Sequence, residues 1–103
     1  MTTKSKAETF IGFAVRSGKL RTGVNTLSTL KKAYLILVSV DAAEETLKTA
    51  VKYAERYRCK AFKTKDKPLE EYLFKAGIKM AAVTDFSLAK AIIENAGTEF
   101  TVI

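Results

Sequence analysis

The sequence predicts an α/β fold: a three-layer α/β/α sandwich with a central mixed sheet of about four strands and helices on both faces. Two observations favour this fold. Segments with the periodicity of amphipathic helices alternate along the chain with short aliphatic runs. Two of these runs, residues 34–40 and 80–84, are almost entirely apolar, which is typical of strands covered on both faces. Helical connections between such strands place helices on both sides of the sheet.

The first helix is expected to begin after Ser5, because Ser5 and Glu8 have the spacing of a capping box. Gly18 should end it. Residues 19–22 are expected to be extended, and a second helix is predicted over about residues 24–32. The apolar positions at helical spacing are Ala7, Phe10, Ile11, Ala14 and Val15 in the first helix, and Val24, Leu27 and Leu30 in the second.

The third helix is expected to begin at Asp41, directly after the apolar run, because Glu44 follows at capping-box spacing. Tyr53 and Tyr57 lie four residues apart on the flank of this helix. They either stack on nucleic-acid bases or cover a seam between helices, and packing is the better supported alternative. The predicted buried stripe is Ala43, Leu47, Ala50, Val51 and Ala54.

Residues 60–64 predict a second strand, and Asp66 and Pro68 predict a fourth helix that Gly77 ends. A third strand is expected over residues 80–84. The inner face of the fourth helix is predicted to be Leu69, Tyr72, Leu73 and Ala76.

Asp85 is expected to cap the fifth helix and Gly97 to end it, after which residues 99–103 add an edge strand. No linker, internal repeat or low-complexity segment interrupts the pattern, so residues 1–103 are predicted to form a single domain. The inward positions of the fifth helix are predicted to be Leu88, Ala89, Ile92, Ile93 and Ala96.

Positive charge is concentrated in the first third of the chain. The formal net charge is +7, and residues 1–34 carry seven basic side chains against Glu8 alone. Such a cluster favours an anionic partner, with nucleic acid first and an acidic membrane second. A basic surface that only promotes solubility is the simpler alternative.

The junction between the extended piece and the second helix is the candidate binding site. Gly23 leaves room for a ligand backbone to come close, and Asn25 carries both donors and an acceptor for a base edge. Lys19 and Arg21 add positive charge beside the unpaired N–H groups of a helix start. The alternative is that Thr22 or Gly23 merely caps a surface helix.

The residue types favour a protein that is not an enzyme and that carries no cofactor or metal. The chain has no histidine and one cysteine, so the commonest general base and metal ligand are missing. Cys59, between Arg58 and Lys60, is expected to be packed rather than reactive. One cysteine and no long apolar run predict a cytoplasmic protein without a membrane segment.

Three stretches resemble the ribosomal-protein superfamily that includes L-seven-Ae and L-thirty-e, and most of all its bacterial YlxQ-like branch. The first, residues 18–25, is similar to the family's basic strand followed by Gly-x-Asn-Glu. The second, residues 33–41, is similar to its central strand, and the third covers residues 81–92. The opening at residues 11–19 is also similar to the YlxQ-like branch, so the resemblance covers nearly the whole chain.

This resemblance implies an α/β/α fold and binding of structured RNA, kink-turn RNA above all. Gly23 would let the RNA backbone approach, Asn25 would bond a base edge, and Lys19 and Arg21 would neutralise phosphates. A loop at residues 77–80 would cover an extruded base. The RNA-binding residues implied are Lys19, Arg21, Thr22, Gly23, Val24, Asn25, Thr26, Ile78, Lys79 and Met80.

Two departures from the family pattern leave an alternative open. Thr26 stands where relatives commonly carry Glu, and one hydroxyl replaces a carboxylate that accepts from two guanine donors. The loop between Gly77 and Asp85 is also shorter than in the family. The sequence therefore predicts a non-catalytic RNA-binding protein whose partners are rRNA or other kink-turn-like RNA and ribonucleoprotein components. The alternative is a protein-interaction module on the same scaffold with weakened RNA specificity.

Overall fold

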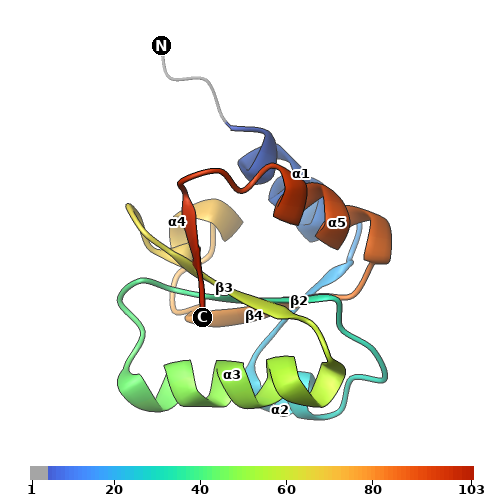
Figure 1. Ribbon diagram of the computed structural model, residues 1–103, viewed down its shortest axis with the longest axis vertical. Helices are drawn as coiled ribbons and strands as arrows, with labels where there is room; N and C mark the ends of the chain where they lie inside the picture. Colours follow the sequence, from blue (N-terminus) through green and yellow to red (C-terminus); the bar gives the residue numbers. More distant parts are fainter. Residues whose placement is uncertain (1–4) are drawn as a thin grey trace.

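The computed structural model describes residues 5–103, except for the side chain of Val24. The strands are β1 (Leu20–Thr22), β2 (Leu35–Val38), β3 (Lys60–Thr64), β4 (Met80–Val83) and β5 (Phe100–Val102). The helices are α1 (Lys6–Arg16), α2 (Val24–Ser28), α3 (Glu44–Tyr57), α4 (Leu69–Leu73) and α5 (Phe86–Glu94). Figure 1 shows α1, α4 and α5 on one side of the sheet and α2 and α3 on the other. The predicted α/β/α sandwich is confirmed, with a 5-stranded sheet in place of about four strands.

Strand β2 lies at the centre of the sheet and is buried on both faces, as its aliphatic run predicts. Leu35 and Leu37 pack toward α1, α4 and α5, whereas Ile36 and Val38 pack toward α2 and α3. All four side chains are fully buried. This two-residue alternation divides the core into two clusters, one on each face of the sheet.

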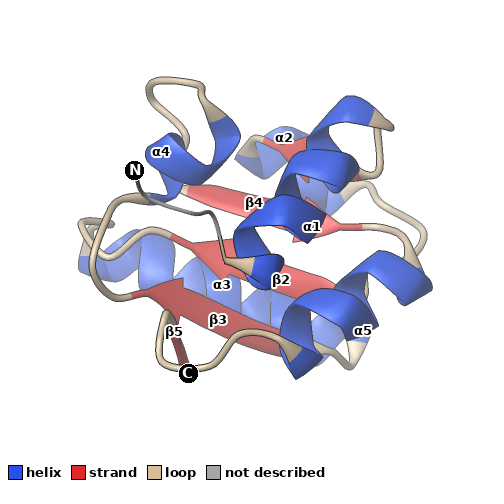
Figure 2. Ribbon diagram, turned by 90° about the horizontal axis from the view of Figure 1, so that it is seen from above, coloured by secondary structure: helices blue, strands red, loops and turns tan. Residues whose placement is uncertain are grey.

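The sheet is mixed, and its order is β1-β4-β2-β3-β5 (Figure 2). Strand β4 pairs antiparallel with both β1 and β2, β2 pairs parallel with β3, and β5 pairs antiparallel with β3. In the β1–β4 pair, Thr22 lies opposite Ala81 and Leu20 opposite Val83. The end of β1 therefore lies beside the start of β4, although more than half the chain separates them.

Two helix starts follow the sequence prediction. The Ser5 hydroxyl accepts a hydrogen bond from the Glu8 N–H (3.1 Å), and the Asp85 carboxylate accepts one from the Leu88 N–H (2.9 Å). Each satisfies one of the N–H groups that a helix leaves unpaired in its first turn. Val15 belongs to the predicted apolar stripe of α1, but its side chain is 40% exposed beyond the buried part of that stripe.

The prediction that the third helix begins at Asp41 is wrong. Helix α3 begins at Glu44, Ala43 occupies the cap position, and the Ala43 side chain is exposed. The Asp41 carboxylate accepts hydrogen bonds from the Ser39 hydroxyl and the Lys79 ammonium instead of capping a helix. A charged partner from a distant loop thus displaces a local cap.

Helices α2 and α4 are shorter than predicted. Helix α2 ends at Ser28 rather than near residue 32, and the Ser28 hydroxyl donates to the Asn25 carbonyl (2.7 Å). Hydroxyls that bond back to carbonyls in this way compete with the helix ladder. Helix α4 ends at Leu73 because Phe74 adopts a left-handed conformation (φ 55°), and Ala76, predicted to face inward, is exposed.

The two tyrosines of α3 take part in packing, as the better supported alternative predicts. Tyr53 is 7% exposed and belongs to the core beneath α3. The Tyr57 hydroxyl donates a hydrogen bond to the Leu27 carbonyl of α2. The two side chains therefore fill the seam between α2, α3 and the sheet.

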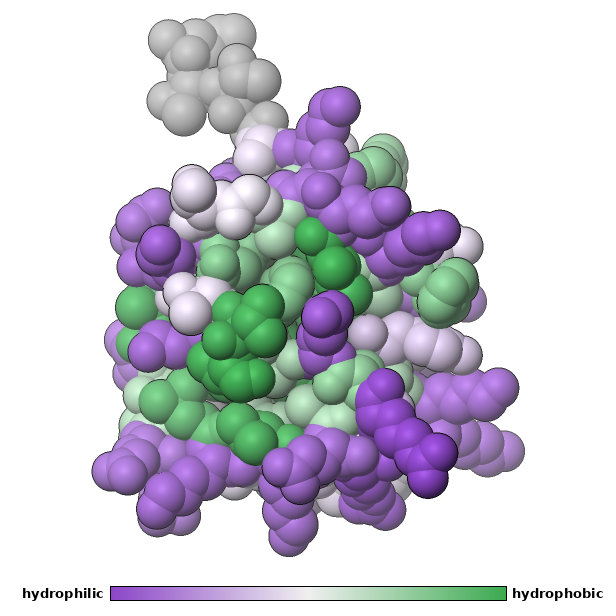
Figure 3. Space-filling view, viewed as in Figure 1, coloured by the Kyte–Doolittle hydropathy of each residue, from purple (hydrophilic) through white to green (hydrophobic). Residues whose placement is uncertain are grey.

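The outer edge of β5 exposes apolar side chains. Val102 is 59% exposed and Ile103 is 42% exposed. Figure 3 shows apolar side chains across the middle of the face on which this strand lies, with hydrophilic side chains along its borders. Ile103 also lines a shallow groove with Leu47 and Val51 of α3. Within residues 5–103, no helix combines the length and apolar character needed to cross a membrane.

Candidate nucleic-acid interface

A shallow depression of about 170 Å³ brings together the two parts of the predicted site. Gly23 at the start of α2 lies on one side of it, and Ile78, Lys79 and Met80 lie on the other. The antiparallel pairing of β1 with β4 produces this arrangement, because Gly23 follows β1 and the 77–79 loop precedes β4. Thr46 of α3 completes the rim and was not part of the predicted site.

Gly23 is exposed and has a backbone conformation that favours glycine. Its φ of +94° and ψ of 136° lie where L side chains are strained. Space is not the constraint, since a Cβ atom added at this position would be 3.9 Å from the Thr26 hydroxyl oxygen, an ordinary contact. The glycine is therefore needed for the turn from β1 into α2, and this turn leaves the backbone open to a ligand.

Asn25 and Thr26 of α2 are both exposed beside Gly23. Their carbonyl groups accept hydrogen bonds from the hydroxyls of Ser28 and Thr29, which hold the short helix together. Within the part of the chain that the structure describes, the Asn25 side-chain amide has no hydrogen-bond partner, so its donors and acceptor remain available. The side chain of Val24, also among the predicted contacts, lies outside the described residues.

Arg21 and Lys19 lie along the edge strand β1 with exposed side chains. Neither forms an ion pair with any described residue. The Lys19 carbonyl accepts hydrogen bonds from the N–H (2.8 Å) and the hydroxyl (3.1 Å) of Thr84, which places Lys19 at the far end of β1. The three residues of β1 separate Lys19 from Gly23 by about 13 Å. Arg21 therefore adjoins the depression, whereas Lys19 extends the positive edge away from it.

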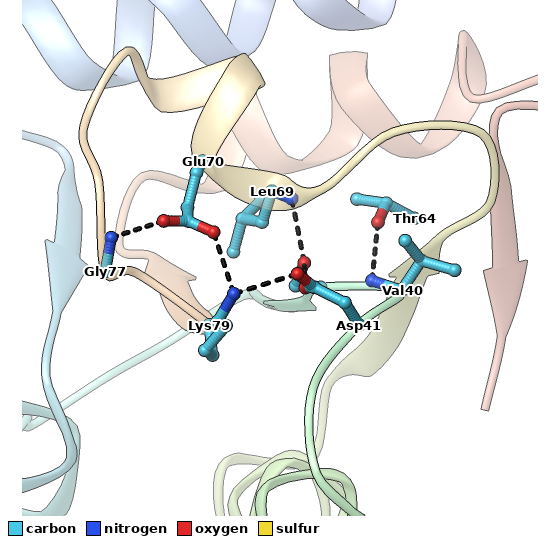
Figure 4. A network of polar contacts seen from close by, with 8 residues as sticks. Val40, Asp41, Thr64, Leu69, Glu70, Gly77 and Lys79 are labelled. Atoms are coloured by element: carbon cyan, nitrogen blue, oxygen red, sulfur yellow. Dashed lines mark hydrogen bonds and ion pairs between the residues drawn. The ribbon is translucent and has the colours of Figure 1, made fainter.

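Lys79 is tied into an acidic network that the sequence did not reveal (Figure 4). Its ammonium contacts Glu70 Oε1 at 2.8 Å and Asp41 Oδ2 at 2.9 Å. Glu70 also accepts a hydrogen bond from the Gly77 N–H. The ammonium group of Lys79, one of the implied RNA-binding residues, is therefore matched by two carboxylates of the protein.

The same contacts shift three pKa values. The hydrogen bond from Ser39, followed by that from Lys79, lowers the pKa of Asp41. The hydrogen bonds from Lys79 and from the Gly77 N–H lower the pKa of Glu70, and the two carboxylates raise the pKa of Lys79. All three groups are thus held in their charged forms near neutral pH.

Two buried hydroxyls anchor this network to the core. The Ser39 hydroxyl donates to Asp41 and accepts from the Leu69 N–H (3.0 Å). The Thr64 hydroxyl accepts a hydrogen bond from the Val40 N–H, with a distance of 2.8 Å. Figure 4 shows this contact beside the network. Ser39 and Thr64 are the only polar side chains among the described residues that are fully buried, and both are paired. The end of β2 is therefore fixed relative to β3 and α4.

The remaining residues of the predicted covering loop are partly or wholly packed. Met80 is 5% exposed and lies in the core toward α2 and α3. Ile78 is half-buried and packs against the core on the opposite face. A base placed over this depression would meet the backbone of the 77–79 loop and the edges of these side chains.

The thiol and the acidic side chains were also considered in the sequence analysis. Cys59 is half-buried, and burial raises the pKa of its thiol from 9.0 to about 11, so the nucleophilic thiolate is scarce near neutral pH. Residues 5–103 contain no group of three or more Cys, Asp or Glu side chains arranged to hold a metal ion.

Comparison with known proteins places the fold but not the activity. No family model and no curated protein matches the chain. Among solved structures 19 chains match. One, described as a protein with unknown function from Bacillus halodurans C, has a TM-score of 0.74 at 20% identity, covering 88% of this chain and 96% of that one. The chain therefore shares its fold with that protein over nearly its whole length.

Proposed function

We propose that the protein is a non-catalytic, cytoplasmic RNA-binding protein related to ribosomal proteins of the L-seven-Ae and L-thirty-e superfamily. It contacts structured, kink-turn-like RNA through β1 and the Gly23-Val24-Asn25 start of α2. The observation that carries this proposal is the exposed Gly23 turn, with the free amide of Asn25 on one side and the cation of Arg21 on the other. An open backbone turn next to a positive edge suits an RNA backbone and the base edges beneath it.

Each exposed residue has a distinct role in this proposal. Arg21 neutralises a phosphate, so its contribution does not depend on RNA sequence and weakens as salt rises. The Asn25 amide bonds a base edge, and its contribution depends on which base is present. Lys79 supplies backbone contact rather than charge, because Asp41 and Glu70 already neutralise it.

The test is a binding titration with a kink-turn stem and a plain duplex of equal length, each at two salt concentrations. Asn25→Ala should weaken kink-turn binding by about 5- to 150-fold while changing duplex binding little. Arg21→Ala should weaken both alike and reduce the salt slope by about one. Lys52→Ala, which changes an exposed lysine of α3 that does not line the depression, is the matched control. Equal losses from Asn25→Ala on both RNAs would argue against base reading.

A second candidate function is a protein-interaction module on the same scaffold. The exposed apolar edge of β5, at Val102 and Ile103, favours it because an edge strand can pair with a strand of another protein. No binding of the kink-turn stem at micromolar protein, together with a complex in cell extract that Val102→Glu abolishes, would support this candidate. Kink-turn binding that survives Val102→Glu would support the RNA proposal.

A further inference from the structure

A second hollow, of about 360 Å³, lies at the opposite end of the sheet from Gly23. It forms where β2 and β3 begin and β4 ends, between Tyr34, Cys59 and Phe86. Ala33, Ala89 and Ile93 supply the rest of its apolar wall. A volume of this size is in the range of small-ligand sites.

An exposed aromatic side chain stands at the mouth of this hollow. Phe86, the first residue of α5, is 62% exposed, although most phenylalanines are buried in a core. Its ring meets the Tyr34 ring edge-on, with centroids 5.7 Å apart and an interplanar angle of 77°. The contact with Tyr34 thus fixes the orientation of the Phe86 ring, while the rest of that ring remains accessible to solvent. Such a surface suits a flat aromatic ring.

Three cations surround the aromatic pair. Arg58, Lys60 and Lys90 all line the hollow with exposed side chains, and Glu94 is its one carboxylate. None of the three cations forms an ion pair with a residue that the structure describes. Arg58 is held at this position by a left-handed backbone (φ 56°) that ends α3 and turns the chain into β3. The hollow therefore carries a surplus of two positive charges.

A flat apolar wall beside uncompensated cations matches a ligand that is aromatic at one end and anionic at the other. We propose that this hollow binds a nucleoside phosphate, with the base against Phe86 and Tyr34 and the phosphate among Arg58, Lys60 and Lys90. The ligand is either a free mononucleotide or one unpaired nucleotide of an RNA strand, which share this chemistry. The site is independent of the RNA contact at Gly23, because it is built from different strand ends.

The test follows backbone amide signals by NMR while four probes are added separately: AMP, adenosine, inorganic phosphate and single-stranded oligoadenylate of eight nucleotides. AMP should shift amides of residues 33–34, 57–60 and 86–93 in a saturable way. Adenosine and phosphate should each bind at least ten-fold more weakly, because each supplies only half of the contact. An oligonucleotide that binds these residues at least ten-fold more tightly than AMP identifies an RNA strand as the ligand, whereas comparable affinities identify a free nucleotide.

Two variants assign the contacts. Phe86→Ala should weaken binding by about 5- to 150-fold, the range for removing one base-stacking aromatic. Its control is Phe74→Ala, which truncates a phenylalanine that is 73% exposed at the end of α4, outside this hollow. Lys90→Glu should weaken AMP but leave adenosine unchanged, and Lys52→Glu on α3 is the matched charge control.

Three results would overturn the proposal. The first is the absence of saturable shifts at the hollow with both AMP and the oligonucleotide at millimolar concentration. The second is inorganic phosphate binding as tightly as AMP, which would define a bare anion site. The third is an equal effect of Phe86→Ala and Phe74→Ala. If Asn25→Ala abolishes kink-turn binding at Gly23 but leaves the AMP-induced shifts unchanged, the two sites act independently. Failure of the RNA proposal can then be distinguished from failure of the nucleotide proposal.

Discussion

The two ends of the sheet differ in whether their basic side chains are paired with carboxylates. At the Gly23 end, the Lys79 ammonium lies between Asp41 and Glu70 and serves the protein's own structure. At the Phe86 end, Arg58 and Lys90 line an apolar hollow and have no carboxylate partner among the described residues. Net charge alone does not distinguish these situations. A cation is available to an anionic partner only where the fold leaves it unpaired. At the Gly23 end, Arg21 meets this condition among the described residues and Lys79 does not.

The largest expected effect is on the reactivity of the Cys59 thiol, which lines the hollow beside Phe86. It tests whether this hollow is apolar enough to disfavour the thiolate. The pKa of the Cys59 thiol is raised to about 11 from an ordinary 9.0, so its thiolate fraction at pH 7.5 falls about 100-fold. Alkylation by iodoacetamide, followed by mass spectrometry, should be slower than that of the unfolded chain by at least this factor. Equal rates in the folded and unfolded chains would mean that the hollow is wet.

The next effect tests the anchoring of the Gly23 end. Ser39→Ala removes the acceptor of the Leu69 N–H and a donor to Asp41 in a fully buried position. A buried group left without a partner costs about 1–3 kcal/mol of unfolding free energy, measurable by urea denaturation. Ser87→Ala, at an exposed position in α5, should change stability by less than about 0.5 kcal/mol. A small loss in Ser39→Ala would show that water replaces the hydroxyl.

Gly23 and Gly12 provide a matched pair of glycine substitutions. Gly23→Ala places a side chain at a φ of +94° and a ψ of 136° and should cost about 1–3 kcal/mol. Gly12→Ala lies inside α1 and makes only an ordinary 3.6 Å contact with the Arg16 guanidinium, so it should stabilise by up to about 1 kcal/mol. Urea denaturation of both variants checks the difference in sign. Stabilisation by both would mean that the Gly23 turn relaxes freely.

The smallest effect concerns pH. Because the pKa values of Asp41 and Glu70 are lowered on folding, their contribution to stability is present above their ordinary values of 3.8 and 4.5 and is lost as pH falls through the folded values. The raised pKa of Lys79 adds stability below 10.5 that disappears as pH rises further. Lys79→Met should therefore flatten the acid limb of a plot of melting temperature against pH. Lys52→Met should leave that limb unchanged.

The sequence predicted those features that depend on neighbouring residues. The aliphatic run around Leu37 defines a strand buried on both faces, and Ser5 and Asp85 carry cap spacings that local geometry uses directly. Asp41 has a cap spacing as well, but its carboxylate contacts Lys79, which lies 38 residues away in the loop before β4. The spacing of residues near Asp41 in the sequence does not reveal that a distant lysine competes with the helix start for its carboxylate.

The candidate site was predictable in part for the same reason. Gly23 indicates a special backbone conformation in the sequence itself, and the structure has one. The burial of Met80 follows from its place in the apolar run of residues 80–84, which is typical of a strand covered on both faces, and was available as a signal. The Phe86 hollow was not, because a phenylalanine after a cap residue is typical of a core position. In the structure α5 packs mainly against α1, and the Phe86 ring meets the Tyr34 ring at the surface, 62% exposed.

The late position of β4 in the chain has a consequence for biosynthesis. β4 separates β1 from β2 in the sheet, yet it is translated after both of them. Until residues 80–83 leave the ribosome, β1 has no neighbour and β2 can pair only with β3. The nascent chain therefore holds the fully apolar β2 with one edge unpaired while residues 39–79 are synthesised, a state that chaperones bind. Folding of the sheet becomes cooperative only when the last third of the chain arrives.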